Sequence, residues 1–273
     1  MAPSPSKTVF LTGASSGIGL ETAKLLTANG YEVWGTSRNP LRLPRLAHFH
    51  PVPMDLARTD SIRAGFAAAL NEAGAFAVLI NNAGAGAFGP LEALPAELVR
   101  EQFQVLVDAP LELIRLALPP MRTRGRGLII NITSLAALFP IPFMAPYSAA
   151  KAALSLFTQE LRMELSSTPI RIVEVRPGDI NTPFHDATKK VEAAGGPEDQ
   201  RRMRAAWETE SRNMAAAPKP QLVAGAIRRV IESRNPPPIV NVGGLFQAKI
   251  APFAARFGSP RLVEWVLRRY YGL

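Results

Sequence analysis

Short apolar segments alternate with longer segments of helical periodicity over the first 180 residues of this 273-residue chain, and no other sequence feature constrains the fold more. The short segments are apolar or β-branched and are closed by Gly, Asn, Ser or Pro, which is typical of buried strands. Because parallel strands are joined by helical crossovers, the alternation predicts a mostly parallel sheet with helices on both faces. The predicted strands are residues 8–12, 32–36, 52–54, 77–81, 128–133, 170–175 and 239–242, and the predicted helices are about 17–29, 59–73, 95–123, 146–167, 197–212 and 221–233.

We expect a single α/β domain over residues 1–273, with a doubly wound, seven-stranded sheet. Hydrophobic residues make up 47% of the chain, which is enough for one large core, and neither a repeat nor a low-complexity linker divides it. Residues 185–220 break the alternation and are rich in charge, Ala and Gly. A long insertion after a strand end of such a sheet usually covers a ligand crevice, so we predict a substrate lid there. Residues 246–273 are aromatic and basic and predict a helical C-terminal tail.

Composition excludes several classes of function. The chain has no cysteine, which rules out disulfides, thiolate catalysis and cysteine-based metal sites. It has no run of the roughly 18 apolar residues that a membrane-spanning helix needs. Residues 1–7 lack the charged start and apolar stretch of a secretory signal, so a cytoplasmic protein is expected. His48 and His50 are isolated from carboxylates in the sequence, so no metal site is predicted.

The net charge of +9 is concentrated in the C-terminal third of the chain. Residues 1–184 hold 16 Lys or Arg against 14 Asp or Glu, whereas residues 185–273 hold 15 against 8. Such an excess can attract nucleic acid or anionic membrane. The basic pairs lack aromatic interleaving and any nucleic-acid motif, so a solvated surface is favoured and no nucleic-acid partner is predicted. The tail could lie on a membrane as a basic amphipathic helix, pack on the lid or meet a partner subunit, and packing or oligomer contact is favoured over peripheral membrane contact.

A glycine-rich turn follows the first predicted strand and leads directly into the first helix. It reads Thr12-Gly13-Ala14-Ser15-Ser16-Gly17-Ile18-Gly19. Glycine lets the backbone approach a pyrophosphate, and the start of a helix offers free N–H groups and a positive dipole end. The spacing is G-x-x-x-G-x-G, which differs from the G-x-G-x-x-G of the usual dinucleotide fingerprint. Its placement still predicts dinucleotide binding on a Rossmann-type fold.

This turn resembles the T-G-x-x-x-G-[IL]-G element of the short-chain dehydrogenase/reductase family, and further family elements follow in order over roughly residues 7–184. The N-N-A-G element is present at residues 81–84. Ser134 resembles the catalytic serine, and Tyr147 with Lys151 resembles the Y-x-x-x-K motif. The layout is also similar to the hydroxysteroid and retinol dehydrogenase branch of the family. The resemblance implies an oxidoreductase that forms a homodimer or homotetramer.

The resemblance and the predicted strand ends together indicate a cofactor site spread along the chain. Its residues come from the glycine turn, the ends of the second, third and fourth strands, the Tyr-x-x-x-Lys motif and the P-G-x-x-x-T stretch that holds the nicotinamide end in the family. They are Gly13, Ser15, Ser16, Gly17, Ile18, Gly19, Ser37, Arg38, Asp55, Leu56, Asn82, Ala83, Gly84, Tyr147, Lys151, Pro177, Gly178, Ile180 and Thr182.

The end of the second strand predicts NADP(H) as the cofactor. Residues 35–39 contain neither Asp nor Glu. An acidic residue at this point would hydrogen-bond the adenosine ribose and repel a 2′-phosphate. Arg38 can instead pair with that phosphate through its planar guanidinium group, and Ser37 can add a hydroxyl donor.

Tyr147, Lys151 and Ser134 form the predicted catalytic group. Hydride transfer to a ketone leaves charge on oxygen, so a proton donor must lie within hydrogen-bond reach of that oxygen. Tyr147 and Lys151 are four residues apart on a predicted helix and therefore share one face. A nearby ammonium group favours the phenolate, so we expect Lys151 to lower the pKa of Tyr147. Ser134, at a strand end, can orient the substrate oxygen.

One position departs from the family pattern. The stretch F-x-V-N-V-x-G-P is represented here by residues 103–110, and Leu106 stands where the family often has Asn. In the family that Asn helps to hold a water in a proton relay that reaches the active-site Lys. Leu106 cannot make the side-chain bond, so either a backbone carbonyl holds the water or turnover is slower. A weakened enzyme or an NADP(H)-binding regulator is therefore the alternative function.

The predicted substrate is a bulky hydrophobic ketone or alcohol of the steroid, retinoid, terpenoid or polyketide kind. Apolar residues with few polar anchors flank the catalytic group, which suits such a molecule. The predicted pocket residues are Leu135, Phe139, Met144, Phe184 and His185. His185 is a candidate polar anchor, although a solvent-facing loop position is favoured for it.

Overall fold

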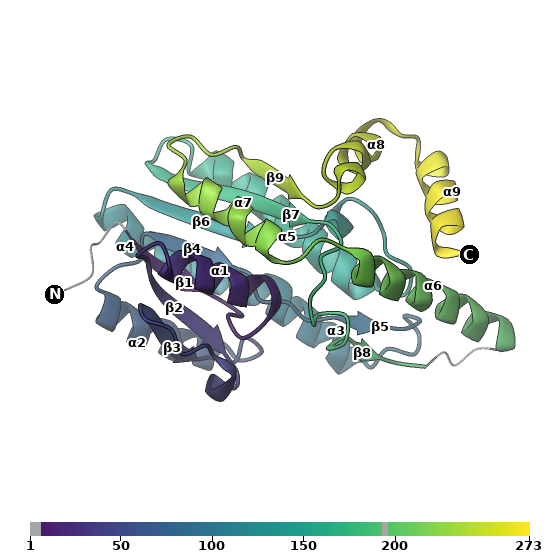
Figure 1. The fold of residues 1–273 in the computed structure, drawn as a ribbon, viewed down its shortest axis with the longest axis horizontal. Helices are drawn as coiled ribbons and strands as arrows, with labels where there is room; N and C mark the ends of the chain where they lie inside the picture. The colour runs from purple at the N-terminus through teal and green to yellow at the C-terminus, as the bar shows by residue number, and fades with distance from the viewer. Residues whose placement is uncertain (1–6, 193–195) are drawn as a thin grey trace.

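The computed structural model describes residues 7–192 and 196–273, and within them one seven-stranded parallel sheet has the order β3-β2-β1-β4-β6-β7-β9 (Figure 1). Its strands are β1 (Thr8–Leu11), β2 (Glu32–Ser37), β3 (Phe49–Pro53), β4 (Val78–Asn81), β6 (Gly127–Ile132), β7 (Ile170–Pro177) and β9 (Ile239–Val242). The strand order changes direction between β1 and β4, which is where doubly wound sheets bind ligands. The predicted Rossmann-type, single-domain fold class is confirmed.

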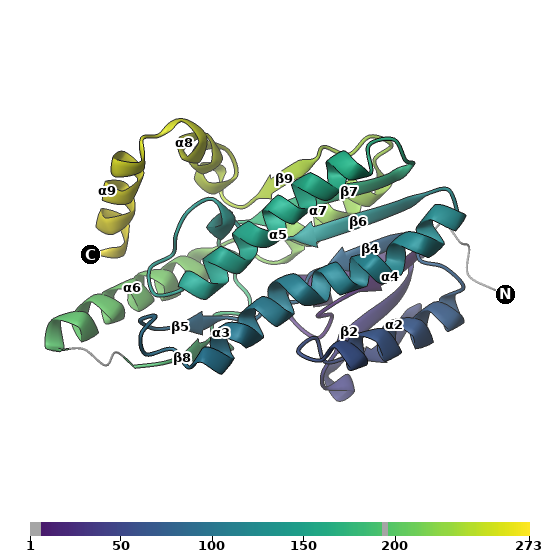
Figure 2. The same cartoon turned by 180° about the vertical axis from the view of Figure 1, so that it is seen from behind.

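Helices cover both faces of this sheet (Figures 1 and 2). Helices α1 (Gly17–Thr27) and α7 (Gln221–Glu232) pack side by side on one face, and α2 (Thr59–Ala73), α4 (Ala109–Thr123) and α5 (Ala145–Glu164) lie on the other. Successive side chains of a strand point to opposite faces, so both faces of a covered sheet need apolar residues. This requirement explains the near-continuous apolar composition of the strands.

Strand β1 shows how the two faces are filled. Val9 and Leu11 belong to the core that includes residues of α1 and α7, and Phe10 belongs to the core that includes residues of α2 and α4. The ring of Phe10 packs edge-on against Phe66 and Phe76, with centroid distances of 5.0 and 5.1 Å. Packing on both sides therefore fixes β1, and with it the start of the glycine turn.

The predicted helix 95–123 is continuous but changes its geometry in the middle. It consists of α3 (Ala96–Phe103), the π-helical turn η2 (Gln104–Asp108) and α4. Leu106, the residue that departs from the family pattern, lies within this π-helical turn. Such turns occur frequently at functional sites, because they interrupt the regular helical hydrogen bonds.

The segment after β7 contains structure that the sequence did not predict. Residues Lys189–Lys190 form strand β8, which pairs in parallel with β5 (Ala87–Phe88) as a second, two-stranded sheet. Helix α6 (Pro197–Ala216) follows and runs farther than the predicted helix 197–212. Residues 193–195 of the predicted lid and residues 1–6 of the predicted N-terminal segment lie outside the described residues.

The C-terminal tail is helical, as predicted, and is divided into three parts. These are the π-helical turn η4 (Phe246–Ile250), helix α8 (Ala251–Phe257) and helix α9 (Pro260–Tyr271). Helix α9 packs against α6 at one end of the molecule (Figure 1). Across residues 7–192 and 196–273, none of the helices has the length and apolar composition needed to span a bilayer.

One sequence-based premise about the histidines is wrong. His48 and His50 were expected to be isolated from carboxylates, but His48 Nδ1 lies 2.7 Å from Glu32 Oε1, and His50 lies 2.8 Å from Glu32 and 2.9 Å from Glu72. The ring of His50 also stacks on Trp34. Parallel pairing of β2 with β3 brings Glu32 close to His48 and His50, and Glu72 comes from α2. The separation of these residues in the sequence conceals the contacts. Among the described residues, no group of three or more His, Asp and Glu side chains could hold a metal ion.

Candidate active site

The glycine turn is built so tightly that larger residues would not fit. A Cβ on Gly19 would lie 2.1 Å from the carbonyl oxygen of Gly13, and a Cβ on Gly13 would lie 2.8 Å from Cα of Ala83. Gly13 and Gly17 also have φ angles of +69° and +54°, in the left-handed region that glycine adopts readily. Glycine at these positions therefore lets α1 start directly against the ends of β1 and β4.

The start of α1 leaves its backbone donors available. Ser16 caps the helix in an extended conformation, and its side chain makes no capping hydrogen bond. No acidic residue lies in the first turn. The first N–H groups of a helix have no partner inside the helix, and its dipole favours negative charge there. This helix end therefore suits a phosphate group.

Hydrogen bonds join the glycine turn to the end of β4. The hydroxyl of Thr12 accepts hydrogen bonds from the backbone N–H groups of Asn82 and Ala83, at 2.9 and 3.0 Å. The side-chain amide of Asn82 donates to the carbonyl oxygen of Thr12 at 2.8 Å. The N-N-A-G element therefore holds the glycine turn in place through these hydrogen bonds.

Two arginines lie where β2 ends. Arg38 follows β2 directly, and Arg42 ends the short helix η1 (Pro40–Arg42). Both line the same cavity as the glycine turn, together with Ser37 and Asp55. Arg42 was not predicted, because only the fold of the loop 38–42 brings it back toward Arg38. Two guanidinium groups near this strand end make the site strongly attractive to a phosphate.

Lys151 is deeply buried beside the end of β6. Its Nζ donates a 2.8 Å hydrogen bond to the carbonyl oxygen of Ile132 and lies 5.9 Å from the centroid of the Tyr147 ring. The side chain is only 4% exposed, and burial lowers the pKa of Lys151 to about 8. Lys151 and Tyr147 therefore lie on one face of α5, as their spacing predicted.

The pKa of Tyr147 differs from the sequence expectation. Burial raises it to about 12, and repulsion by Glu210 and Asp179 adds to this, whereas a hydrogen bond with the Ser134 side chain lowers it. The expected lowering by Lys151 is not found, because desolvation of the phenolate is the dominant effect in this buried position. With a pKa of about 12, Tyr147 keeps its proton at neutral pH.

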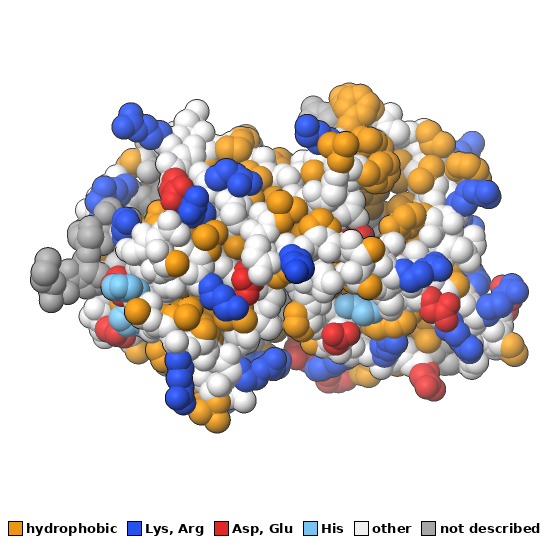
Figure 3. Space-filling view, in the orientation of Figure 1, with side chains coloured by type: hydrophobic (Ala, Val, Ile, Leu, Met, Phe, Trp, Pro, Cys, Tyr) orange, Lys and Arg blue, Asp and Glu red, His pale blue; other side chains and the backbone are white. Residues whose placement is uncertain are grey.

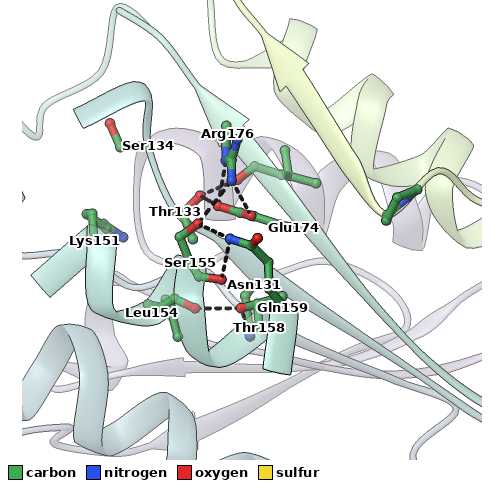
Figure 4. A network of polar contacts seen from close by, with 12 residues as sticks. Asn131, Thr133, Ser134, Lys151, Leu154, Ser155, Thr158, Gln159, Glu174 and Arg176 are labelled. Atoms are coloured by element: carbon green, nitrogen blue, oxygen red, sulfur yellow. Dashed lines mark hydrogen bonds and ion pairs between the residues drawn. The ribbon is translucent and has the colours of Figure 1, made fainter. Parts of the chain in front are cut away.

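A buried polar network lies beneath the catalytic residues and joins α5 to β6 and β7 (Figure 4). Glu174 is fully buried and receives two hydrogen bonds from Arg176, at 2.7 and 2.9 Å, and one from Thr133 at 2.7 Å. Arg176 also donates to the hydroxyl of Ser155 on α5 at 3.0 Å. Asn131 donates to Thr158 at 2.8 Å. These bonds hold the helix that carries Tyr147 and Lys151 against the strand ends.

A cavity of about 490 Å³ runs along the carboxyl ends of β1, β2, β4, β6 and β7. All the predicted catalytic and cofactor residues line it: Gly13, Ser15, Ser16, Gly17, Ile18, Gly19, Ser37, Arg38, Asp55, Leu56, Asn82, Ala83, Gly84, Ser134, Tyr147, Lys151, Pro177, Gly178, Ile180 and Thr182. Segments that are up to about 170 residues apart in the chain thus converge on one site.

A family model described as short chain dehydrogenase matches residues 7–193. The chain belongs to the short-chain dehydrogenase family. It is 33% identical to 3-ketodihydrosphingosine reductase of Bacteroides thetaiotaomicron, over 97% of this chain and 98% of that one. It is also 31% identical to ketoacyl reductase HetN of Nostoc, over 86% of this chain and 78% of that one. This short-chain dehydrogenase is therefore an oxidoreductase related to ketoreductases.

Solved structures agree with this assignment. A short-chain dehydrogenase from Streptomyces avermitilis has a TM-score of 0.81 and 28% identity, with 97% of both chains covered. A 3-ketoacyl-(acyl-carrier-protein) reductase from Brucella melitensis was solved with NADH, and a metagenomic short-chain oxidoreductase was solved with NADP. Their TM-scores are 0.72 and 0.69, their identities 23% and 26%, and they cover 86% and 87% of this chain and 96% of their own. Members of this fold thus use either dinucleotide.

The surroundings of Tyr147 in this short-chain dehydrogenase are aromatic and apolar. Met144 is buried in a cluster that includes Tyr147 and Phe184, whose rings lie 5.4 Å apart, so two of the predicted pocket residues adjoin Tyr147. Leu135 is buried in helix η3 (Leu135–Ala137), and Phe139 is half-buried just after it. Of the five predicted pocket residues only Phe184 lines the cavity, so only part of the predicted pocket is brought together.

His185 has a different environment from the expected one. Its ring stacks on Trp207 of α6 at a centroid distance of 3.9 Å, and its Nε2 lies 2.8 Å from the hydroxyl of Ser211. It does not line the cavity, and it lies half-buried in the turn after β7. His185 packs the segment 185–192 against α6.

Several residues near the site were missed by the sequence analysis. Trp207 of α6 and Tyr271 of α9 pack in the cluster that includes Tyr147. Glu210 is 6% exposed, and burial together with repulsion from Asp179 raises its pKa to about 7. Among the described residues, neither carboxyl group has an ion pair. Trp207, Tyr271 and Glu210 come from segments with no family motif, whereas Asp179 lies within the P-G-x-x-x-T stretch, where the sequence analysis assigned it no role.

Leu106 packs tightly in the π-helical turn. It is 1% exposed and belongs to a cluster with Val107 and Ala150, against which Tyr147 also packs. The side chain thus supports the helix that carries the catalytic pair, but it offers no polar atom. Any relay through this position has to use the backbone.

Proposed function

We propose that this short-chain dehydrogenase is an NADP(H)-dependent ketoreductase or alcohol dehydrogenase acting on a bulky hydrophobic substrate. The observation that carries the proposal is the convergence of Ser134, Tyr147 and Lys151 with the glycine turn in one cavity at the carboxyl end of the sheet. The bound nicotinamide would supply a hydride to the carbonyl carbon. Each group of this site then has one defined task.

Tyr147 acts as the proton donor in the reduction. As the carbonyl carbon accepts the hydride, the carbonyl oxygen gains an electron pair and takes the proton from the phenol of Tyr147. Ser134, whose side chain lowers the pKa of Tyr147, orients the same oxygen. The buried Lys151 holds ribose hydroxyls and returns a proton to Tyr147, a role that its pKa of about 8 suits.

NADP(H) is proposed over NAD(H) on the charge at the end of β2. Arg38 and Arg42 provide two guanidinium groups there, and no carboxylate follows the strand within residues 35–42. The 2′-phosphate of NADP(H) matches this charge, and NAD(H) lacks it. The tight glycine turn and the free start of α1 fit the pyrophosphate of either cofactor.

A bulky apolar substrate is supported by the cluster beside Tyr147. Phe88, Met144 and Tyr271 are buried there, and Phe184 and Trp207 pack against them. Aromatic and apolar side chains of this kind bind hydrophobic ligands with few polar anchors. Segment 185–192 and α6, which cover this cluster, serve as the lid. The resemblance to the hydroxysteroid and retinol branch stays a prediction.

The π-helical turn supports an intact proton relay despite Leu106. Such a turn interrupts the regular i to i−4 hydrogen bonds, and we assign the water of the relay to a backbone carbonyl of this turn. That carbonyl replaces the side chain of the family asparagine. If the relay is instead broken, the protein is a weakened enzyme or an NADP(H)-binding regulator.

Oxidation of NADPH with a panel of hydrophobic ketones tests the proposed function. We expect turnover with at least one ketone and a clear preference for NADPH over NADH. Tight NADPH binding without turnover across the panel would favour the regulator instead. A homo-oligomer is proposed as well, because Leu156, Phe157 and Met163 on α5 expose an apolar face; size-exclusion chromatography tests it.

A further inference from the structure

A stripe of large apolar side chains runs along η4 and α8 and faces solvent. Phe246, Ile250 and Phe253 recur at helical spacing and are between 52% and 65% exposed. Phe257 continues the stripe and contacts the ring of Phe253. In Figure 3 these hydrophobic side chains gather over α8 at the top of the molecule. A contiguous exposed patch of this kind marks an interaction site.

Helix α9 extends the patch with its outer face. Leu262, Trp265 and Val266 are between 45% and 60% exposed. The inner face of α9 is occupied, because Tyr271 is buried and Leu267 packs in the cluster with residues of α6. The apolar outer residues are thus not needed to hold α9 in place.

The tail is also fixed to the active site by one side chain. Gln247 donates to the carboxylate of Asp179 at 2.6 Å and accepts from the backbone N–H of Asp179 at 3.0 Å. A Cβ on Gly178 would lie 2.4 Å from Oε1 of Gln247, so the contact is close. The exposed stripe is therefore presented on a segment that is firmly attached to the end of β7.

The basic charge of residues 243–273 indicates which kind of partner this surface binds. Residues 243–273 contain Lys249, Arg256, Arg261, Arg268 and Arg269 against the single acid Glu264. Glu264 is already paired with Arg268 at 2.7 Å. Basic residues beside aromatic and aliphatic ones match an anionic lipid surface, since the rings enter the interface and the cations meet the headgroups.

We propose that η4, α8 and α9 form a peripheral docking surface for an anionic lipid bilayer. A second copy of this chain is the poorer occupant, because a two-fold contact through this patch would place basic residues against basic residues. Docking is independent of the proposed reaction. If the proposed function holds, docking also places the substrate cluster, which shares α9, close to a supply of lipid-soluble ketones.

Sedimentation with vesicles tests the docking surface. The full-length protein is mixed with vesicles of phosphatidylcholine alone or of equal parts phosphatidylcholine and phosphatidylglycerol. We expect binding to the anionic vesicles and a marked decrease at high salt. The double substitution Phe246→Ser and Phe253→Ser should lower the partition coefficient about tenfold or more. Lys249→Glu with Arg261→Glu should lower it to a similar degree.

Matched controls separate docking from general effects. Leu222→Ser removes an exposed apolar residue on α7, and Arg100→Glu reverses an exposed charge on α3, so neither should change vesicle binding. All variants should keep the wild-type circular dichroism and NADPH oxidation in solution. The proposal is overturned if the wild type does not bind anionic vesicles, or if the phenylalanine variant binds as well as the wild type. It is also overturned if that variant dissociates an oligomer while vesicle binding is absent.

Discussion

The ammonium group of Lys151 is anchored to the carbonyl oxygen of Ile132 by a 2.8 Å hydrogen bond, which joins α5 to the last residue of β6. The bond holds the Lys151 ammonium group 5.9 Å from the centroid of the Tyr147 ring. Burial therefore decides the pKa of both groups, upward for Tyr147 and downward for Lys151. Burial, and not the partner residue, is thus the largest influence on the pKa of Tyr147 and of Lys151.

Substitution Tyr147→Phe should lower kcat by about 10²–10⁴-fold, because it removes the proton donor and leaves the ring packing in place. NADPH binding, measured by fluorescence titration, should be retained. Tyr270→Phe is the matched control, since this tyrosine is half exposed and bonds only Asn213 among the described residues. Near-normal turnover of the Tyr147 variant would refute the assigned role.

Substitution Arg38→Ser should raise KM for NADPH by about 10-fold to 100-fold, as expected for the loss of a charge-assisted hydrogen bond. KM for NADH should change little, because NADH lacks the 2′-phosphate. Arg42→Ser should act in the same direction. Arg45→Ser serves as the control, since this exposed arginine does not line the cavity. An equal rise in KM for NADPH and for NADH would contradict the assignment of NADP(H).

Glu210 should make the folded protein less stable as the pH rises from about 4.5 to about 7. Its folded-state pKa is about 7, against 4.5 for an unperturbed Glu, so the folded state binds more protons in this interval. The stabilisation is fully present below pH 4.5 and is lost above 7, and the shift corresponds to about 3 kcal/mol.

Urea unfolding at pH 5 and pH 8 measures this effect. Glu210→Gln should reduce the difference in unfolding free energy between the two pH values, and Glu208→Gln, on an exposed position of the same helix, should leave it unchanged. An unaltered pH dependence in the Glu210 variant would show that its carboxyl group titrates normally.

Substitution Arg176→Met should lower the free energy of unfolding by about 3–5 kcal/mol, because it leaves the fully buried Glu174 without its partner. The double variant Glu174→Gln with Arg176→Met should recover part of this loss, since no unpaired charge then stays buried. Urea denaturation of the single and double variants provides the comparison. If Arg176→Met is as stable as the wild type, the ion pair between Glu174 and Arg176 does not stabilise the fold.

Substitution Leu106→Asn should leave kcat within about twofold of the wild type while lowering stability by about 1–3 kcal/mol, the cost of burying an amide. The reason is that the proposed relay uses the backbone of the π-helical turn and not the side chain at position 106. Leu106→Met, which keeps the side chain apolar, controls for packing. A several-fold gain in kcat would instead show that the relay is incomplete in the natural protein.

The sequence alone determined the sheet, its covering helices and most of the cofactor cavity. These features depend on local properties, namely apolar periodicity, glycine where a turn needs it, and the Tyr-x-x-x-Lys spacing that places two side chains on one helix face. Parallel strands then bring their carboxyl ends to one edge of the sheet. Residues as distant in the chain as Gly13 and Thr182 therefore line the same cavity.

Only the tertiary structure decided the pKa values at the site and which side chains surround Tyr147. The pKa of Tyr147 depends on how much water the packed chain excludes and on its distance from Glu210 and Asp179, which belong to separate segments of the chain. Arg42 reaches the cavity through the fold of a loop, and Tyr271 reaches the catalytic cluster from the end of the chain. Burial and contacts between distant segments are properties of the packed chain, so the local pattern that fixes strands and helices cannot specify them.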